Sequence, residues 1–193
     1  PNGRRMGYRL RGMENVVRAA EEVRRAVDLG ARGFIVYDIG LLMLLSRLRQ
    51  AGELPASTVF KVSVHMGCAN PLSARVYEDL GADTINPVPD LDIGMLAAMR
   101  AAVSCPLDLF TDTAEEAGGF LRTDDVPEFV RVASPVYLKC GAISQPRQNH
   151  LPSDDELRER VRQTACVVET LARHGLADDQ VGPTERTLGL PEI

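Results

Sequence analysis

The chain has 193 residues, of which 45% are hydrophobic, and it carries a formal net charge of −5 at pH 7. This length and hydrophobic content suffice for one domain with its own core. The acidic balance argues against a nucleic-acid or anionic-membrane partner, because either would favour a basic surface. No apolar run approaches the roughly 20 residues that span a bilayer, and no secretory segment opens the chain, so we expect a cytoplasmic protein.

The hydrophobic pattern alternates between helical and strand-like segments along the chain. Residues 1–12 are basic and glycine-rich without periodicity, which indicates a loop, and residues 14–29 have apolar positions at helical spacing. Strands are then predicted at 33–40, 57–65, 83–88, 106–113 and 135–142, and helices at 41–52, 71–82, 91–103, 124–133 and 153–174. The tail, 176–193, carries two prolines and is predicted to be irregular.

Regular alternation of strands and helices predicts a parallel sheet with right-handed crossovers. A doubly wound sheet would need strands that are apolar on both faces, and these strands are not. We therefore predict an α/β fold of the (β/α)8 TIM-barrel type, as a single partial domain over residues 1–193. About five C-terminal β/α units are present, three strands short of a barrel, so we expect an N-terminal portion to be missing here.

Strand parity divides the polar from the apolar side chains, because successive residues point to opposite faces. Lys61 and His65 share one face of their strand, Tyr137 and Lys139 share one face of another, and Asp108 and Asp112 line up on a third. In a barrel the polar face points inward and ends at the site on the carboxyl side of the strands. The predicted constellation is Asp38, Lys61, His65, Asn86, Asp108, Asp112 and Lys139.

Lys61 and Lys139 are the only lysines in a chain with 20 arginines. Both fall inside predicted strands, where a charged side chain is costly unless it is paired. One of them could bind a carboxylate or phosphate, or form a Schiff base with a carbonyl. The alternative is a buried ion pair, with Asp108 as the natural partner.

The cysteines are scattered at Cys68, Cys105, Cys140 and Cys166, without CxxC spacing. Reduced thiols are therefore expected rather than a disulfide framework, and we expect no metal and no cofactor. By strand parity Cys140 faces the helices as part of the core.

His65 is interpreted as a general base or as a structural histidine, in preference to a metal ligand with Cys68. Asp108 and Asp112 are four residues apart, about 13 Å along a strand, and so cannot form one carboxylate dyad. Gly118, Gly119 and Gly141 follow the last two strands, where their backbone N–H groups could meet an anion.

Three stretches resemble a bacterial group of peptidase U32-like proteins. They are NPLSARVYEDLGADTINPVPDLDIGMLAAMRAAVSCPLDLFTD, GGFLR and PEFVRVASPVYLKCGA, within a likeness that runs from about Asp38 to the last helix. The resemblance implies a TIM barrel of roughly twice this core and a hydrolase or peptidase activity. Better-known members carry an E-x-F motif followed by Gly and a cysteine cluster. Here Asp108 replaces the Glu and no cysteine follows Asp112, so an iron–sulfur cluster is not expected.

Together these observations predict an enzyme that acts on a small carboxylate- or amide-bearing substrate at the carboxyl ends of the strands. The predicted catalytic residues are Lys139, Lys61, Asp38, Asp112 and His65, and the predicted substrate-binding residues are Asn86, Asp108, Gly118, Gly119 and Gly141. A lysine-dependent lyase or aldolase, and a non-catalytic half barrel that needs a partner, remain alternatives. The expected partner is a small molecule or peptide, and a homo-oligomer is left open.

Overall fold

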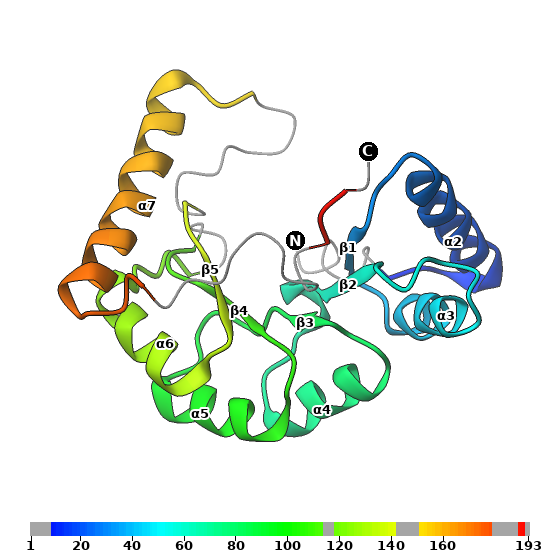
Figure 1. The fold of residues 1–193 in the computed structure, drawn as a ribbon, viewed down its shortest axis with the longest axis horizontal. Helices are drawn as coiled ribbons and strands as arrows, with labels where there is room; N and C mark the ends of the chain where they lie inside the picture. The colour runs from blue at the N-terminus through cyan, green and yellow to red at the C-terminus, as the bar shows by residue number, and fades with distance from the viewer. Residues whose placement is uncertain (1–8, 114–117, 142–150, 179–188, 192–193) are drawn as a thin grey trace. The chain divides into compact units, whose positions relative to one another are not determined.

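The structure is a computed structural model that describes residues 9–113, 118–141, 151–178 and 189–191 (Figure 1). The chain forms two compact units. The first unit comprises residues 1–88, 102–105 and 182–193, and the second comprises 89–101 and 106–181. The prediction of a single domain over 1–193, with its loop at 1–12 and its irregular tail at 176–193, stays a prediction.

The first unit alternates helices with parallel strands. Its elements are α2 (Gly12–Asp28), β1 (Gly33–Val36), α3 (Ile39–Gln50), β2 (Val59–Val62), the short 3-10 helix η1 (Val64–Met66), α4 (Pro71–Asp79) and β3 (Thr84–Ile85). Strands β1 and β2 pair in parallel with Ile35 opposite Lys61, and β2 and β3 pair in parallel with Lys61 opposite Thr84. Helices α2 and α3 lie side by side (Figure 1).

Local sequence explains where these helices begin. The Asn70 side chain accepts a hydrogen bond from the Ser73 N–H, and the Ser73 hydroxyl oxygen accepts one from the Asn70 N–H. Pro71 occupies the first position of α4. This reciprocal pair satisfies backbone donors that a helix start leaves without intrahelical partners. Asp38 caps α3 in the same way through the Leu41 N–H.

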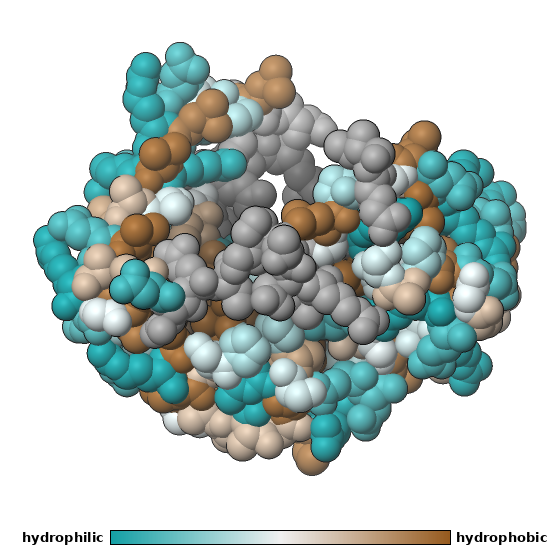
Figure 2. Space-filling view, viewed as in Figure 1, coloured by the Kyte–Doolittle hydropathy of each residue, from teal (hydrophilic) through white to brown (hydrophobic). Residues whose placement is uncertain are grey.

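The core of the first unit lies where α3 and α4 cover the strands. Leu42, Leu45, Phe60, Val62 and Ile85 are fully buried there. The outer surface of α2 is strongly hydrophilic (Figure 2), and α2 buries only Ala20 and Val27.

One buried ion pair closes the first unit at the amino ends of its strands. The Arg49 guanidinium lies 2.6 Å from Asp83 Oδ2 and donates to the Thr58 and Gly81 carbonyls. The same Asp83 oxygen accepts from the Phe60 N–H at 2.8 Å. These bonds therefore join helix α3, which carries Arg49, to strand β2 and to the two loops that precede β2 and β3.

Residues far apart in sequence meet at the start of β1. Gly189 passes so close to Gly33 that a Cβ built on Gly189 would lie 2.7 Å from the Gly33 Cα, and one built on Gly33 would lie 3.2 Å from the Gly189 carbonyl oxygen. Gly189 also has φ +58°, a conformation that costs glycine little. A side chain at either position would push these two segments apart.

The second unit repeats the alternation. Its elements are α5 (Ile93–Ala102, which ends in the first unit), β4 (Leu107–Phe110), the 3-10 helix η3 (Thr123–Asp125), α6 (Val126–Ala133), β5 (Val136–Lys139) and α7 (Asp154–Arg173). Strands β4 and β5 are parallel, with Asp108 opposite Tyr137 and Phe110 opposite Lys139. Helix α7 lies beside α6 (Figure 1) and buries Val167 and Leu171.

Arg122 organises the turn before α6. Its guanidinium stacks 4.6 Å from the Phe129 ring, pairs with Asp125 and donates to the Pro89 and Leu91 carbonyls. Phe129 is almost fully buried beneath it.

The predicted order of helices and parallel strands is confirmed within each unit, so the α/β class is correct. The strands are shorter than predicted: β2 ends at Val62, where Ser63 begins a 3-10 turn, and β3 spans only Thr84–Ile85. Among the residues described, no helix is both long and apolar enough to cross a membrane.

Candidate functional site

One face of the β4–β5 pair carries the polar side chains of Asp108, Tyr137 and Lys139. In a parallel ladder, paired residues point to the same face, so the register groups Asp108 with Tyr137 and Phe110 with Lys139. Asp108 is only 2% exposed, whereas Lys139 is exposed at the carboxyl end of β5. The Lys139 Nζ lies 4.5 Å from the Phe110 ring centroid, which orients the ammonium by a cation–π contact.

Asp112 ties the ends of β4 and β5 together. Its Oδ1 accepts a 2.8 Å hydrogen bond from the Gly141 N–H and one of 3.2 Å from the Thr111 hydroxyl. It is 2% exposed and forms an antiparallel bridge with Leu121. Asp112 therefore holds the rim of the predicted site in place, and the Gly141 N–H is already engaged by this carboxylate.

Gly118 and Gly119 lie just before Leu121, the residue that forms this bridge. Both have left-handed φ angles, +107° and +62°, and a Cβ on Gly118 would lie 2.4 Å from the Phe120 ring. Thr113 completes the turn by accepting the Phe120 N–H at 2.8 Å. These glycines shape the turn beside the predicted rim.

Lys61 sits at the centre of the first unit's three strands. The register places Ile35 and Thr84 on its face, one on each side. The Thr84 hydroxyl is buried and has no hydrogen-bond partner among the described residues. Lys61 itself is half-buried, whereas Ile35 on the same face is 57% exposed.

Asn86 stabilises the turn that follows β2. Its side-chain oxygen accepts the Val64 N–H at 3.2 Å, and its own N–H donates to the Val62 carbonyl at 2.9 Å. It is 1% exposed. The Asn86 side-chain amide, which was predicted to orient a substrate, therefore bonds to the backbone N–H of Val64.

Asp38 is engaged by backbone on both oxygens. Oδ1 accepts the Leu41 N–H at 2.9 Å and Oδ2 accepts the Leu10 N–H at 3.2 Å. Asp38 lies beyond β1, which ends at Val36, and is the N-cap of α3, so strand alternation does not govern its direction.

His65 lies in η1 beyond the end of β2, so strand alternation does not govern its direction. Its exposed ring meets the Tyr37 ring edge-on, with 6.1 Å between centroids and 75° between planes. The Arg9 guanidinium joins the same corner, donating to the Tyr37 carbonyl at 2.6 Å and the His65 carbonyl at 3.0 Å. Sequence reasoning missed Arg9, because nothing in a loop without periodicity indicates which carbonyls an arginine reaches.

The surroundings of two cysteines, Cys68 and Cys140, favour the protonated thiol. Burial raises the pKa of Cys68, against the opposing effect of its hydrogen bond with Ser73. Burial likewise raises the pKa of Cys140, and the nearby Asp112 carboxylate adds to the rise. Both cysteines are therefore thiols near neutral pH. In the described part of the chain, no group of His, Cys, Asp or Glu side chains could hold a metal ion.

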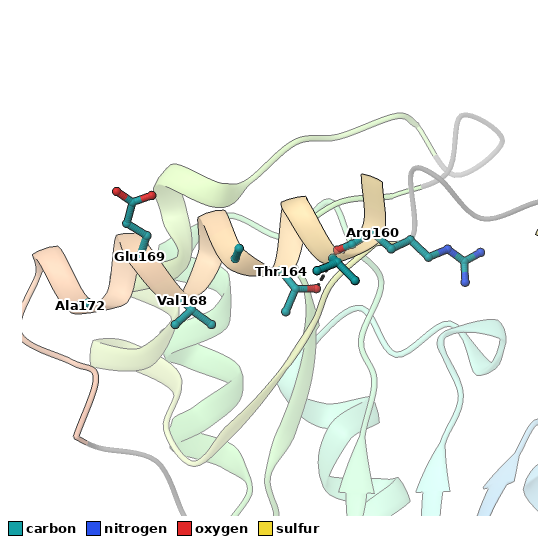
Figure 3. Close-up of a pocket in the computed structure, with 7 residues that line it drawn as sticks. Arg160, Thr164, Val168, Glu169 and Ala172 are labelled. Carbon is teal, nitrogen blue, oxygen red and sulfur yellow. Dashed lines mark hydrogen bonds between the residues drawn. The ribbon is translucent and has the colours of Figure 1, made fainter. Parts of the chain in front are cut away.

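Two shallow surface depressions lie along α7, and Figure 3 shows the one lined by Arg160. They are formed by one side of this helix, between Asp154 and Ala172. Arg160 lies close to Gly141: a Cβ built on Gly141 would be 3.1 Å from the Arg160 Cγ. None of the predicted catalytic or binding residues lines either depression.

Residues 10–114 match Peptidase family U32. The match covers more than half of the chain, and the protein belongs to this family. No curated protein matches the sequence.

Three solved structures resemble the chain. The U32 peptidase Mk0906 is 24% identical, with a TM-score of 0.43 over 51% of this chain and 38% of that one. The YdjI aldolase from Escherichia coli is 17% identical, with a TM-score of 0.45 over 86% and 64%. Nitroalkane oxidase from Streptomyces ansochromogenes is 15% identical, with a TM-score of 0.36 over 83% and 58%. This chain therefore spans less than two thirds of each of them.

Proposed function

We propose that this U32 family protein is an enzyme that binds a small carboxylate- or amide-bearing substrate at the carboxyl ends of β4 and β5. In this proposal Lys139 holds the anionic group of the substrate. The observation that carries it is the exposed Lys139 ammonium held over Phe110, on the same strand face as Asp108 and Tyr137. An exposed ammonium suits binding, whereas nucleophilic lysines are usually desolvated.

The proposal extends the parallel strands to a (β/α)8 barrel. Parallel sheets in α/β proteins are covered on both faces, and a barrel would enclose the strand face of each unit that carries Lys61 or Asp108 and open it at the carboxyl ends of the strands. The remaining strands would come from further β/α units. Family membership supports a hydrolytic reaction on an amide, and Asp108 would then be a carboxylate on the same strand face as Lys139.

The decisive experiment measures how much a substrate carboxylate contributes to binding. Binding of a set of short peptides is measured by calorimetry against the same peptides with amidated C-termini. The native protein should prefer the carboxylate forms, and Lys139→Met should lose that preference by about tenfold or more, as expected when one charged hydrogen bond is removed. Lys139→Arg should retain part of it. A Lys139→Met protein with unchanged preference would contradict the proposal.

Lys61→Met is the matched control, because it removes the other lysine from the other unit. Hydrolysis is followed separately by mass spectrometry of new amine termini in a peptide mixture. The lyase alternative is tested by incubating the protein with small carbonyl compounds and adding borohydride, which reduces any imine to a stable adduct. A mass adduct on Lys139 would favour the lyase over the hydrolase.

A further inference from the structure

A short return segment, residues 120–122, lies beside the end of β5. The Thr111 N–H donates to the Lys139 carbonyl at 3.0 Å, and the Thr111 carbonyl accepts from the Arg122 N–H at 2.8 Å. Thr111 therefore bonds both to the last residue of β5 and to the return segment. Because neighbouring strands lie about 4.8 Å apart, the backbones of Lys139 and Leu121 are separated by on the order of 10 Å across Thr111.

The Leu121 side chain lies next to that of Asp112. Two backbone hydrogen bonds between residues 111–113 and 120–122, of 2.8 and 2.9 Å, flank the bridge between Asp112 and Leu121. Bonds that flank a pair in this way define the narrow kind of antiparallel pair, whose two side chains are close neighbours on one face. The Asp112 carboxylate accepts the Gly141 N–H at 2.8 Å. Leu121 thus lies beside the carboxylate that joins the ends of β4 and β5.

Leu121 is exposed, yet its backbone is firmly held. It is 68% exposed. The next side chain, Arg122, is only 14% exposed, pairs with Asp125 and donates to the Pro89 and Leu91 carbonyls. Exposed leucines are common on protein surfaces, but this one is presented by a segment that is hydrogen-bonded on both sides. A group that is already held in place loses little conformational entropy when a ligand covers it.

A second apolar side chain lies beneath the Lys139 ammonium. Phe110 is half-buried, and its ring centroid is 4.5 Å from the Lys139 Nζ. The exposed cation therefore has an aromatic ring beside it and, across Thr111, an exposed leucine. In a barrel the carboxyl ends of the strands stay open, so Leu121 would lie at the mouth and not under the outer helices that further β/α units would complete. A ligand that fits this mouth carries a carboxylate with an apolar group close to it.

We propose that Leu121 determines the specificity of the Lys139 site by contacting an apolar side chain next to the substrate carboxylate. This inference rests on the proposed function and narrows its substrate class to peptides or acylated amino acids that end in an apolar residue. Lys139 binds the carboxylate, and Leu121 covers the side chain beside it. Arg122 holds the return segment in position.

Calorimetry with four N-acetylated dipeptides tests the two contacts separately. The dipeptides end in leucine or glutamine, each as the free carboxylate and as the amide. The native protein should bind the leucine carboxylate about fivefold more tightly than the glutamine carboxylate, as expected for one partly buried apolar side chain. Leu121→Asn should remove this leucine preference and keep the carboxylate preference, whereas Leu121→Met should keep both. Lys139→Met should lose the carboxylate preference.

Leu29→Asn is the matched control, because Leu29 is 89% exposed and lies in the first unit. It should change neither preference. Urea denaturation verifies that each variant is folded under the binding conditions, and Leu121→Ala replaces the asparagine variant if that one does not fold. A native protein that prefers carboxylates but not leucine, or a leucine preference that survives Leu121→Asn, would overturn the role of Leu121 alone. A native protein without carboxylate preference would overturn the proposed function and this inference with it.

Discussion

The two units use polar side chains on their strands differently. In the first unit, the side-chain oxygens of Asn86 and Asp38 accept hydrogen bonds from backbone N–H groups. The Asp83 carboxylate accepts from both the Arg49 guanidinium and the Phe60 N–H. In the second, Lys139 is exposed above an aromatic ring, on a face shared with a buried carboxylate. A polar residue near a strand end is therefore no sign of chemistry by itself. The contrast predicts that first-unit substitutions alter stability, while Lys139 alters binding.

The largest effect should come from the buried ion pair. Asp83→Ala leaves Arg49, whose side chain is 14% exposed, without its carboxylate and should cost about 3–5 kcal/mol of unfolding free energy. Urea denaturation measures it. Glu128→Ala, which breaks the exposed Arg131 pair, is the control and should cost under about 1 kcal/mol. Equal losses would remove the distinction between these two pairs.

Acid should reveal the next largest effect, at Glu78. Burial opposes ionisation, but hydrogen bonds from Ser104, Cys105 and Arg75 outweigh it and lower the pKa of Glu78 to about 2. The carboxylate therefore stabilises the fold above about pH 4.5, and this contribution is lost as pH falls towards 2. Glu78→Gln should lower stability by on the order of 2–3 kcal/mol at pH 7. The difference from the native protein should vanish near pH 2 in denaturant titrations, and a difference constant with pH would refute this account.

Asn86→Ala should follow in size. It leaves the buried Val64 N–H without its acceptor, at a cost of about 1–3 kcal/mol. Chemical denaturation measures the loss, and calorimetry at a temperature where the variant is folded should find carboxylate preference unchanged. A change in the preference for carboxylate peptides, with no loss of stability, would instead indicate that Asn86 binds the substrate.

Asp38 should behave as a helix cap. Asp38→Ala should cost about 1 kcal/mol, whereas Asp38→Asn should keep most of the stability, because asparagine caps nearly as well. Thermal unfolding distinguishes them. If catalysis is found, Asp38→Asn should retain it; an inactive but stable Asp38→Asn protein would identify an acid or base.

The smallest stability effect belongs to Lys139. It is exposed, so Lys139→Met should change unfolding free energy by no more than about 0.5 kcal/mol while removing carboxylate preference. A large destabilisation in the same denaturation assay would mean that the lysine is part of the framework, as the polar residues of the first unit are.

Strand parity predicted the second unit well because β4 and β5 remain extended through the residues concerned. Asp108, Phe110, Tyr137 and Lys139 share a face as the alternation requires. It misled in the first unit because β1 ends at Val36 and β2 at Val62, before Asp38 and His65 are reached. Helix-capping preferences could have identified Asp38.

Other features lay outside the reach of local pattern. The carbonyls that Arg9 bonds come from two segments, and their meeting depends on how the chain folds back. Closure of the barrel in the proposed function would depend on packing among many strands. In α7, in contrast, apolar residues are visible in the sequence on more than one side of the helix, and only the structure shows that Val167 and Leu171 are buried while Leu157, Val161 and Val168 are exposed.

The contact between Gly33 and Gly189 also bears on synthesis. The ribosome makes Gly33 early and Gly189 only after the whole of the second unit, so the first unit lacks this contact until the second has been translated. A bulkier residue at either glycine should leave both units with their own cores and yet loosen the seam between β1 and the segment 189–191. Hydrogen exchange at the beginning of β1 would register that loosening.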